Sequence, residues 1–450
     1  MLIKNQIYTK LIQNFIFLII VLTILFGRTL MGLYIFNYRL GELIVALGLA
    51  LSFYFLLNKK IFIEKYNGKF FIITSLIFVT SLISLFVSST LKLNTYNFKS
   101  SSFIWLMSYI IIAHVFKKYL FFEKYHLVVL NISLILIYLF SVVYFPSFLK
   151  NFFMMNSDKF DYLKASDILI ALVIISILNN SDLIFKFKYS NEYFFILISI
   201  FLPLLVFKSR GSAIAFIVFI ILELFRLKKS INFSFIKWII LIILCLVMFF
   251  TSTFLVTDAV KEYDQVVLNV NLINKLLEEK NTNFDSFLSF YIIDEIDDLI
   301  NFKLLNNGRI FSTDGNINWR LQIWQDVLLM SFDKYRYIYG IGYNEKIPAM
   351  NNPLYVGQDG TNEYVHNFIV NIYARGGLIL VFLYYLFFAN LYKLRKENNY
   401  LSVFLTPLLV VSLFDSSMSS VQFPLLFFFY IGFFLININE ETIQQEKGII

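Results

Sequence analysis

Cysteine, histidine and proline are scarce in this sequence of 450 residues, which contains one, three and six of them. The single Cys245 excludes an intrachain disulfide, and it lies in an apolar run where cysteine behaves as a small hydrophobic residue. No Cys-x-x-Cys pair is present, and His114, His126 and His366 are far apart, so no metal-binding pattern is visible. The glycine patterns of P-loops and dinucleotide-binding folds are also absent. We therefore expect no metal and no other cofactor.

Charge is scarce as well, at 15% of the residues, whereas 59% are apolar and 19% are aromatic. A soluble fold cannot bury so much apolar surface, so lipid must solvate most of this chain. We expect an all-α integral membrane protein that binds membrane lipid. In a soluble protein the net charge of +8 would suggest nucleic acid. Here the positions of the basic residues are expected to set topology, and no nucleic-acid partner is expected.

Apolar runs long enough to cross about 30 Å of hydrocarbon recur along the chain. The first is followed by Gly-Arg rather than by a small-residue cleavage site, so we interpret it as a span and not as a signal peptide. The predicted spans lie near residues 11–27, 40–57, 70–89, 101–116, 126–146, 165–180, 193–207, 212–226, 236–255, 367–391, 401–415 and 421–438.

The basic residues between these runs test the count of about twelve. If the N-terminus is cytoplasmic, the inner segments contain 18 Lys and Arg residues and the short outer loops contain eight. This asymmetry follows the positive-inside rule, and an odd number of spans would break it. The sequence therefore predicts that both termini are cytoplasmic.

Residues 256–365 interrupt the apolar pattern on the outer side. They contain nine Lys and Arg against sixteen Asp and Glu, a net charge of −7, whereas the rest of the chain carries +15. Helical periodicity in 292–299 and 319–332 favours a small, mostly helical subdomain over a tether. The predicted organisation is 1–255 with spans one to nine, 256–365 as the extracytoplasmic subdomain, and 366–450 with spans ten to twelve and a cytoplasmic tail.

Arg210 lies in a tight outer turn, Lys208–Ser212, between the seventh and eighth predicted spans. The following helix would add its N-terminal amides and dipole to the guanidinium, and both attract an anion such as phosphate. The alternative is that Arg210 only anchors the helix at the lipid headgroups.

Arg320 and Trp324 are four residues apart in a predicted helix of the subdomain and share one face. This pair would suit an arginine directed at a phosphate beside an aromatic ring that stacks on a sugar or a polyprenyl chain. The alternative is an ordinary amphipathic helix in which Trp324 packs inward.

His366-Asn367 stands at the start of the tenth predicted span and is followed by Arg375-Gly376-Gly377. Histidine moves protons readily near neutral pH, so His366 is a candidate general base. Nine residues of α-helix leave Arg375 rotated by half a turn relative to His366, so the two reach one site only if the helix start is irregular. The glycines favour close helix packing. The alternative is an interfacial, hydrogen-bonded histidine. Weaker candidates are Arg309, the carboxylates Asp359 and Glu363, and the in-membrane residues Glu42, Asp167 and Glu223.

These features together resemble the O-antigen polymerase and O-antigen ligase superfamily of bacterial surface-polysaccharide assembly. The resemblance rests on an ordered set within about residues 206–380. The set comprises an arginine in a short outer turn, a long outer loop with Arg-x-x-x-Trp and Gly340-Ile341-Gly342, and then His366-Asn367 before Gly377. The first two hundred residues match only in hydropathy.

The resemblance implies a multi-span glycosyltransferase of GT-C-like architecture in the bacterial inner membrane, with its active site facing the periplasm. Its donor would be an undecaprenyl-pyrophosphate-linked oligosaccharide, and a chain-length regulator protein is a further partner. Arg210 and Arg320 would hold the pyrophosphate, and His366 would orient or deprotonate the acceptor hydroxyl in an inverting, metal-independent transfer. Arg309, Arg375, Trp324 and Asn367 are secondary candidates.

Three functions are compatible with these patterns. A polymerase extends a lipid-linked repeat unit, and a ligase transfers the glycan to lipid A-core; Leu380, where the ligase pattern often has a small or hydroxyl residue, favours the polymerase. A flippase of lipid-linked oligosaccharide would have about as many helices. Such transporters often contain internal repeats and midplane sites, and the sequence shows no repeat.

Overall fold

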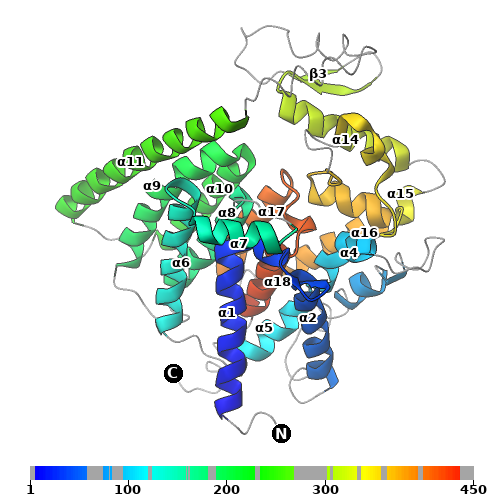
Figure 1. The fold of residues 1–450 in the computed structure, drawn as a ribbon, viewed down its shortest axis with the longest axis horizontal. Helices are drawn as coiled ribbons and strands as arrows, with labels where there is room; N and C mark the ends of the chain where they lie inside the picture. Colours follow the sequence, from blue (N-terminus) through cyan, green and yellow to red (C-terminus); the bar gives the residue numbers. More distant parts are fainter. Residues whose placement is uncertain are drawn as a thin grey trace.

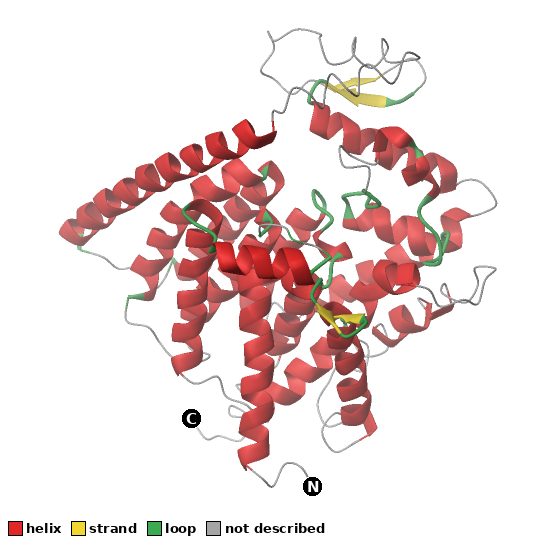
Figure 2. Cartoon of the chain, in the orientation of Figure 1, coloured by secondary structure: helices red, strands yellow, loops and turns green. Residues whose placement is uncertain are grey.

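The computed structural model describes the chain in fourteen segments, within which most residues are helical (Figures 1 and 2). These segments are residues 6–57, 74–80, 82–83, 95–119, 124–158, 160, 163–180, 189–228, 234–267, 302–304, 308–331, 336–355, 362–393 and 399–435.

The α-helices follow the apolar runs of the sequence. They are α1 (Gln6–Met31), α2 (Leu40–Leu57), α4 (Thr95–Trp105), α5 (Ser108–Tyr119), α6 (Lys124–Val142), α7 (Ser147–Asn156), α8 (Ala165–Asn179), α9 (Ser190–Lys208), α10 (Arg210–Leu227), α11 (Phe235–Val267), α14 (Gly315–Ser331), α15 (Arg336–Tyr339), α16 (Phe368–Lys393), α17 (Asn399–Ser412) and α18 (Gln422–Leu435). Short 3₁₀ helices are η4 (Pro348–Asn351), η5 (Pro353–Tyr355) and η7 (Ser417–Ser419).

Strands in the described segments are confined to two small antiparallel hairpins (Figure 2). In the first, β1 (Tyr34–Ile35) pairs with β2 (Tyr38–Arg39); in the second, β3 (Phe302–Leu304) pairs with β4 (Ile310–Ser312). The sequence did not predict either hairpin, and β4 packs against α14.

The chain is a multi-pass membrane protein by the length and apolar character of its helices. Five described helical segments are long and apolar enough to cross a membrane: Gln13–Met31, Lys124–Val142, Ser190–Lys208, Phe235–Thr257 and Phe368–Lys393. Four shorter apolar segments are Leu40–Tyr54, Ala165–Asn179, Tyr400–Ser412 and Gln422–Leu435. The count of twelve spans stays a prediction.

Burial separates the central helices from the peripheral ones. Every residue of α8 and of α18 is buried, which explains why both are apolar on all sides. In α11, by contrast, only 17% of the apolar segment is buried, and large side chains such as Ile240 and Phe250 are exposed. Exposed aliphatic and aromatic side chains on a helix of this length fit a lipid-facing position.

Several expected boundaries differ from the structure. The span predicted at 101–116 is divided, because α4 ends at Trp105 and α5 begins at Ser108. Helix α11 continues past residue 255, and α7 was not predicted. The helix expected at 292–299, most of the span expected at 70–89 and the tail after residue 435 lie outside the described residues.

The described parts of residues 302–365 pack around α14, at the end of the molecule opposite the start of α1 (Figure 1). Helix α14 coincides with the one predicted at 319–332. The buried residues Ile323, Val327, Met350 and Val365 form a separate apolar cluster, against which Trp324 packs. This cluster connects α14 to the start of α16, where His366 is found.

Two glycine pairs join the segment 340–342 to α16 backbone against backbone. The amide N–H of Ile341 donates to the Ala374 carbonyl at 2.9 Å, and that of Gly342 donates to the Arg375 carbonyl at 2.9 Å. A Cβ on Gly377 would lie 2.3 Å from the Ile338 carbonyl, and its φ of +61° interrupts the helix. The close packing expected of these glycines is thus confirmed.

Candidate functional site

His366 occupies a strained turn between α14 and α16. Its φ is +52°, a left-handed conformation that is rare for a residue other than glycine. Its two neighbours are fixed: the Trp324 indole N–H donates to the Val365 carbonyl at 2.7 Å, and Asn367 caps α16 by accepting from the Val370 amide at 3.0 Å. The flanking contacts therefore hold the imidazole in one place.

The ring of His366 is largely enclosed. Its Nε2 lies 3.2 Å from Oδ1 of Asn362, and its centroid lies 5.2 Å from that of the Trp319 ring. Nδ1 is buried and has no hydrogen-bond partner among the described residues. Burial, together with the positive charge of Arg320, lowers the pKa of His366 from 6.5 to about 4, although Asp415 opposes this. The imidazole is therefore neutral at physiological pH.

Asn362 indicates which nitrogen carries the proton. Its side-chain NH₂ donates to the carbonyls of Tyr355 and Tyr364, at 3.0 and 3.2 Å, so its Oδ1 is the atom that faces His366. An oxygen accepts only, so Nε2 of His366 must be the donor. Nδ1 then keeps its lone pair and can accept a proton.

Arg320 extends from α14 to the loop after α17. One Nη donates to the Phe414 carbonyl at 2.6 Å, while Nε is buried without a partner in the described chain. Burial lowers the pKa of Arg320, but Asp415 and Asp314 oppose that effect, and an arginine stays charged. Arg320 thus has a buried N–H group that could donate to a ligand oxygen.

Arg210 begins α10, and Ser209 caps that helix by accepting from the Ser212 amide at 3.3 Å. The Arg210 side chain is 74% exposed and pairs with Asp314 at 2.5 Å. Asp314 in turn caps α14 by accepting from the Ile317 amide at 2.9 Å. Burial opposes ionisation of Asp314, but that amide and Arg210 lower the pKa of the carboxyl. One carboxylate therefore lies between the charges of Arg210 and Arg320.

Asp415 is a site residue that sequence reasoning missed. It follows α17, accepts from the Ser166 hydroxyl at 2.6 Å and accepts from the Ser416 amide at 2.7 Å. Burial opposes its ionisation, but Lys164, Ser166 and His366 lower its pKa. An aspartate at the end of the apolar run 401–415 was the available signal, because carboxylates in such positions are functional candidates by default.

The loop around Asp415 connects the other candidates. Asn367 donates to the Leu413 carbonyl at 3.0 Å, and Arg320 donates to the next carbonyl, that of Phe414. A Cβ on Gly211 would lie 2.6 Å from Cβ of Phe414, so only glycine lets the start of α10 approach this loop so closely. Arg210, Arg320, His366 and Asn367 are therefore assembled at one end of the helical bundle.

Two of the secondary candidates have other partners. Arg309 pairs with Asp326 and donates to Gln322 at 3.2 Å, which links β4 to α14. Arg375 is 3% exposed and donates to the carbonyls of Gly342 and Glu345, at 3.0 and 2.6 Å. Both contacts hold the subdomain together, so neither arginine is placed at the His366 cluster.

The carboxylate candidates from the sequence have partners elsewhere in the fold. Glu223 is fully buried and pairs with Arg226 one turn later in α10. Asp167 contacts Gln422 Nε2 at 3.3 Å, and Glu42 accepts from the Arg39 amide at 3.1 Å. Glu363 pairs with Lys99, whereas Asp359 lies outside the described residues.

Among the described residues no group of three or more His, Cys, Asp or Glu could hold a metal ion. The cluster instead combines two arginines, one neutral imidazole and two carboxylates at the end of a membrane bundle. Such a cluster can bind a phosphate-containing group at the arginines and take a proton from a hydroxyl at the imidazole.

The chain is thus a multi-pass membrane protein whose candidate site brings arginines, an imidazole and carboxylates together at one end of its helices. Residues 194–385 match the family model described as O-antigen ligase, so this segment is similar to proteins of O-antigen assembly. The matched segment contains Arg210, Arg320 and His366 but not Asp415. A search of curated proteins found no match.

Proposed function

We propose that the protein is a polymerase of a bacterial surface polysaccharide. It would transfer the glycan of an undecaprenyl-pyrophosphate donor to a lipid-linked repeat unit, on the outer side of the inner membrane. The superfamily supports activity of the polymerase or ligase type. The observation that carries the proposal is the placement of Arg320 and the neutral His366 around the same carboxylate, Asp415.

Each residue has a role in this proposal. Arg320 and the exposed Arg210 bind the donor pyrophosphate and stabilise its charge as the bond to the anomeric carbon breaks. The acceptor oxygen attacks that carbon from the opposite face, so its configuration inverts, and the hydroxyl proton passes to Nδ1 of His366. Asp415 stabilises the imidazolium that results. Two guanidinium groups supply positive charge at the leaving group, so the proposed transfer does not require a divalent metal.

The choice between polymerase and ligase rests on the sequence around α16. Leu380 is 1% exposed and packs on Gly376, at a position where the ligase pattern often has a small or hydroxyl residue. The matched family description, O-antigen ligase, is the observation that keeps the ligase as the second candidate. A ligase would use the same donor site and transfer the glycan to lipid A-core.

The test is the polysaccharide ladder of a deletion strain complemented with single variants. We expect Arg210→Ala, Arg320→Ala and His366→Ala to lose chain extension at normal protein levels, with Arg309→Ala as the matched arginine control. Normal ladders from all three site variants would contradict the proposal. A deletion strain with one repeat on lipid A-core indicates a polymerase; polymer retained on undecaprenyl pyrophosphate indicates a ligase, and repeats retained on the cytoplasmic side indicate a flippase.

A further inference from the structure

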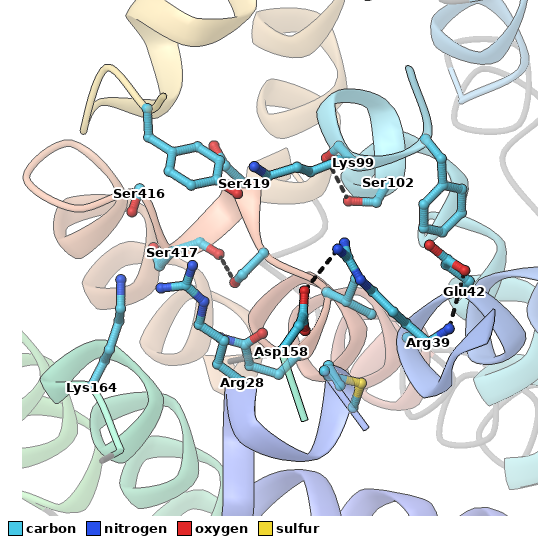
Figure 3. A pocket seen from close by; sticks show the side chains of 18 of the residues that line it. Arg28, Arg39, Glu42, Lys99, Ser102, Asp158, Lys164, Ser416, Ser417 and Ser419 are labelled. Carbon is cyan, nitrogen blue, oxygen red and sulfur yellow. Dashed lines mark hydrogen bonds and ion pairs between the residues drawn. The ribbon is translucent and has the colours of Figure 1, made fainter. Parts of the chain in front are cut away.

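A second polar pocket lies beside the His366 cluster, between α1, α2, α4 and η7 (Figure 3). Its empty volume is about 690 Å³, including the part open to solvent. In Figure 3 the side chains of Arg28 and Lys164 extend toward the loop that carries Ser416 and Ser417. The lining residues are mostly polar, and their most buried members include Ser417 and Gln422.

The lining mixes donors and acceptors. Its charged side chains are four basic and two acidic ones: Arg28, Arg39, Lys99, Lys164, Glu42 and Asp158. Two of the cations are paired, Arg39 with Asp158 at 2.7 Å and Lys99 with Glu363. A sugar hydroxyl both donates and accepts, so it can use carboxylates, ammonium groups and serines alike, whereas a phosphate can use only the donors. The lining therefore suits a saccharide.

Two buried polar atoms of the lining have no partner in the described part of the chain. Ser417 is 3% exposed and its Oγ is unpaired, while Gln422 is 2% exposed and its Oε1 is unpaired. The amide nitrogen of Gln422 faces Asp167, so the oxygen remains available as an acceptor. Buried polar groups are usually hydrogen-bonded, and a ligand hydroxyl would satisfy both of these atoms.

The pocket shares residues with the surroundings of Asp415. Ser166, which donates to Asp415, and Ser416, whose amide donates to it, both line the pocket. Lys164 lines it too, and its charge acts on both Asp415 and His366. A sugar in the pocket would therefore lie next to the carboxylate that supports the proposed base.

The pocket also lies outside the family-matched segment. Of its lining residues, only Tyr364 falls within 194–385, and the others lie within 28–166 and 416–422. The two arginines proposed to bind the donor lie within that segment. We propose that this pocket is a saccharide-binding subsite that holds the sugar of the acceptor, a role that rests on the proposed polymerase function.

The test measures sugar binding by the full-length protein in lipid nanodiscs, independently of transfer. The probe is the repeat-unit oligosaccharide released from its carrier by mild acid, followed by saturation-transfer NMR. We expect Ser417→Ala with Gln422→Met to weaken binding by about tenfold, as loss of two hydrogen bonds implies. Ser176→Ala, at another buried serine with an unpaired Oγ, should bind like wild type.

Two further binding measurements distinguish a saccharide site from an anion site and separate this inference from the proposed polymerase function. Binding should persist in Arg320→Ala and in the presence of inorganic pyrophosphate; displacement by pyrophosphate would overturn the saccharide assignment in favour of an anion site. Unchanged binding by the double variant would also overturn it. If the double variant does not fold, Ser419→Tyr replaces it in the test. This substitution fills the half-buried rim of the pocket, so it must reduce binding. A normal ladder from Arg320→Ala would count against the polymerase and not against sugar binding.

Discussion

The pKa of His366 gives the sharpest prediction, because charges on both sides of the ring oppose each other. The value falls from 6.5 to about 4 through burial and Arg320, while Asp415 acts in the other direction. That difference corresponds to roughly 3 kcal/mol against charging the ring in place. At pH 7 only about one ring in a thousand is then protonated, whereas about a quarter would be in water.

Two substitutions should move this pKa in opposite directions. Arg320→Gln removes a positive charge near the ring, so the pKa of His366 should rise toward its usual value. Asp415→Asn removes the negative charge, so the pKa should fall further. In both variants burial should still lower the pKa of His366, because the ring keeps its contacts with Trp319 and Asn362.

The assay is an NMR titration of protein labelled in its histidine side chains, in detergent, from about pH 3.5 to about pH 7.5, which brackets both values. The chain has three histidines, so the signal lost in His366→Gln identifies the resonance. An inflection near 6.5 in the wild type would refute the enclosure of the ring. Shifts of the same sign in the two variants would refute the electrostatic argument.

The same shift predicts how activity and stability depend on pH. At limiting donor, the titration of His366 should leave the rate of polymer formation unchanged above about pH 5. The rate should decline as the pH falls through about 4, because the base becomes protonated. Between about pH 4 and pH 6.5, His366 is protonated in the unfolded chain but not in the folded one. Folding stability should therefore decrease as the pH falls through that window, and His366→Gln should remove this part of the decrease.

Two further predictions concern packing and the control arginine. Gly211→Val would place its side chain against Phe414. Overpacking of this kind should lower the free energy of unfolding by about 1–3 kcal/mol and abolish the ladder. A variant that melts and polymerises like wild type would contradict the close approach. Arg309→Gln breaks the partly buried pair with Asp326 and the hydrogen bond to Gln322, both outside the His366 cluster. Thermal unfolding should change slightly and the ladder should persist; a lost ladder would place Arg309 in the site.

Hydropathy predicted the helices well because period and length depend on local residues. The runs at 165–180 and 421–438 became α8 and α18, and the periodic stretch after Trp319 became α14. It could not predict the break between α4 and α5, since no proline or glycine interrupts residues 101–116 and the interruption depends on tertiary packing. The hairpin β3–β4 likewise has strands of three residues, too short for a periodic signal.

The candidate site shows the same limit. Motifs pointed to Arg210, Arg320 and His366, but a motif does not reveal which carboxylate lies between two cations. Asp314 and Asp415 acquire that role only because α14 and the loop after α17 meet at the Phe414 carbonyl. The half-turn argument could not apply to Arg375 and His366 as it stood, because His366 precedes α16 in a left-handed turn; Arg375 is drawn instead to the carbonyls of the 342–345 segment.

The balance of charges around His366 also suggests why the proposed base is weak in the free protein. Arg320 lowers its pKa, but the guanidinium would be neutralised once a pyrophosphate bound to it. The ring would then become more basic while Asp415 continued to favour its charged form. Proton transfer from an acceptor hydroxyl would therefore be promoted when the donor is in place. An arginine beside a histidine, unfavourable in the empty site, thus couples donor binding to activation of the acceptor.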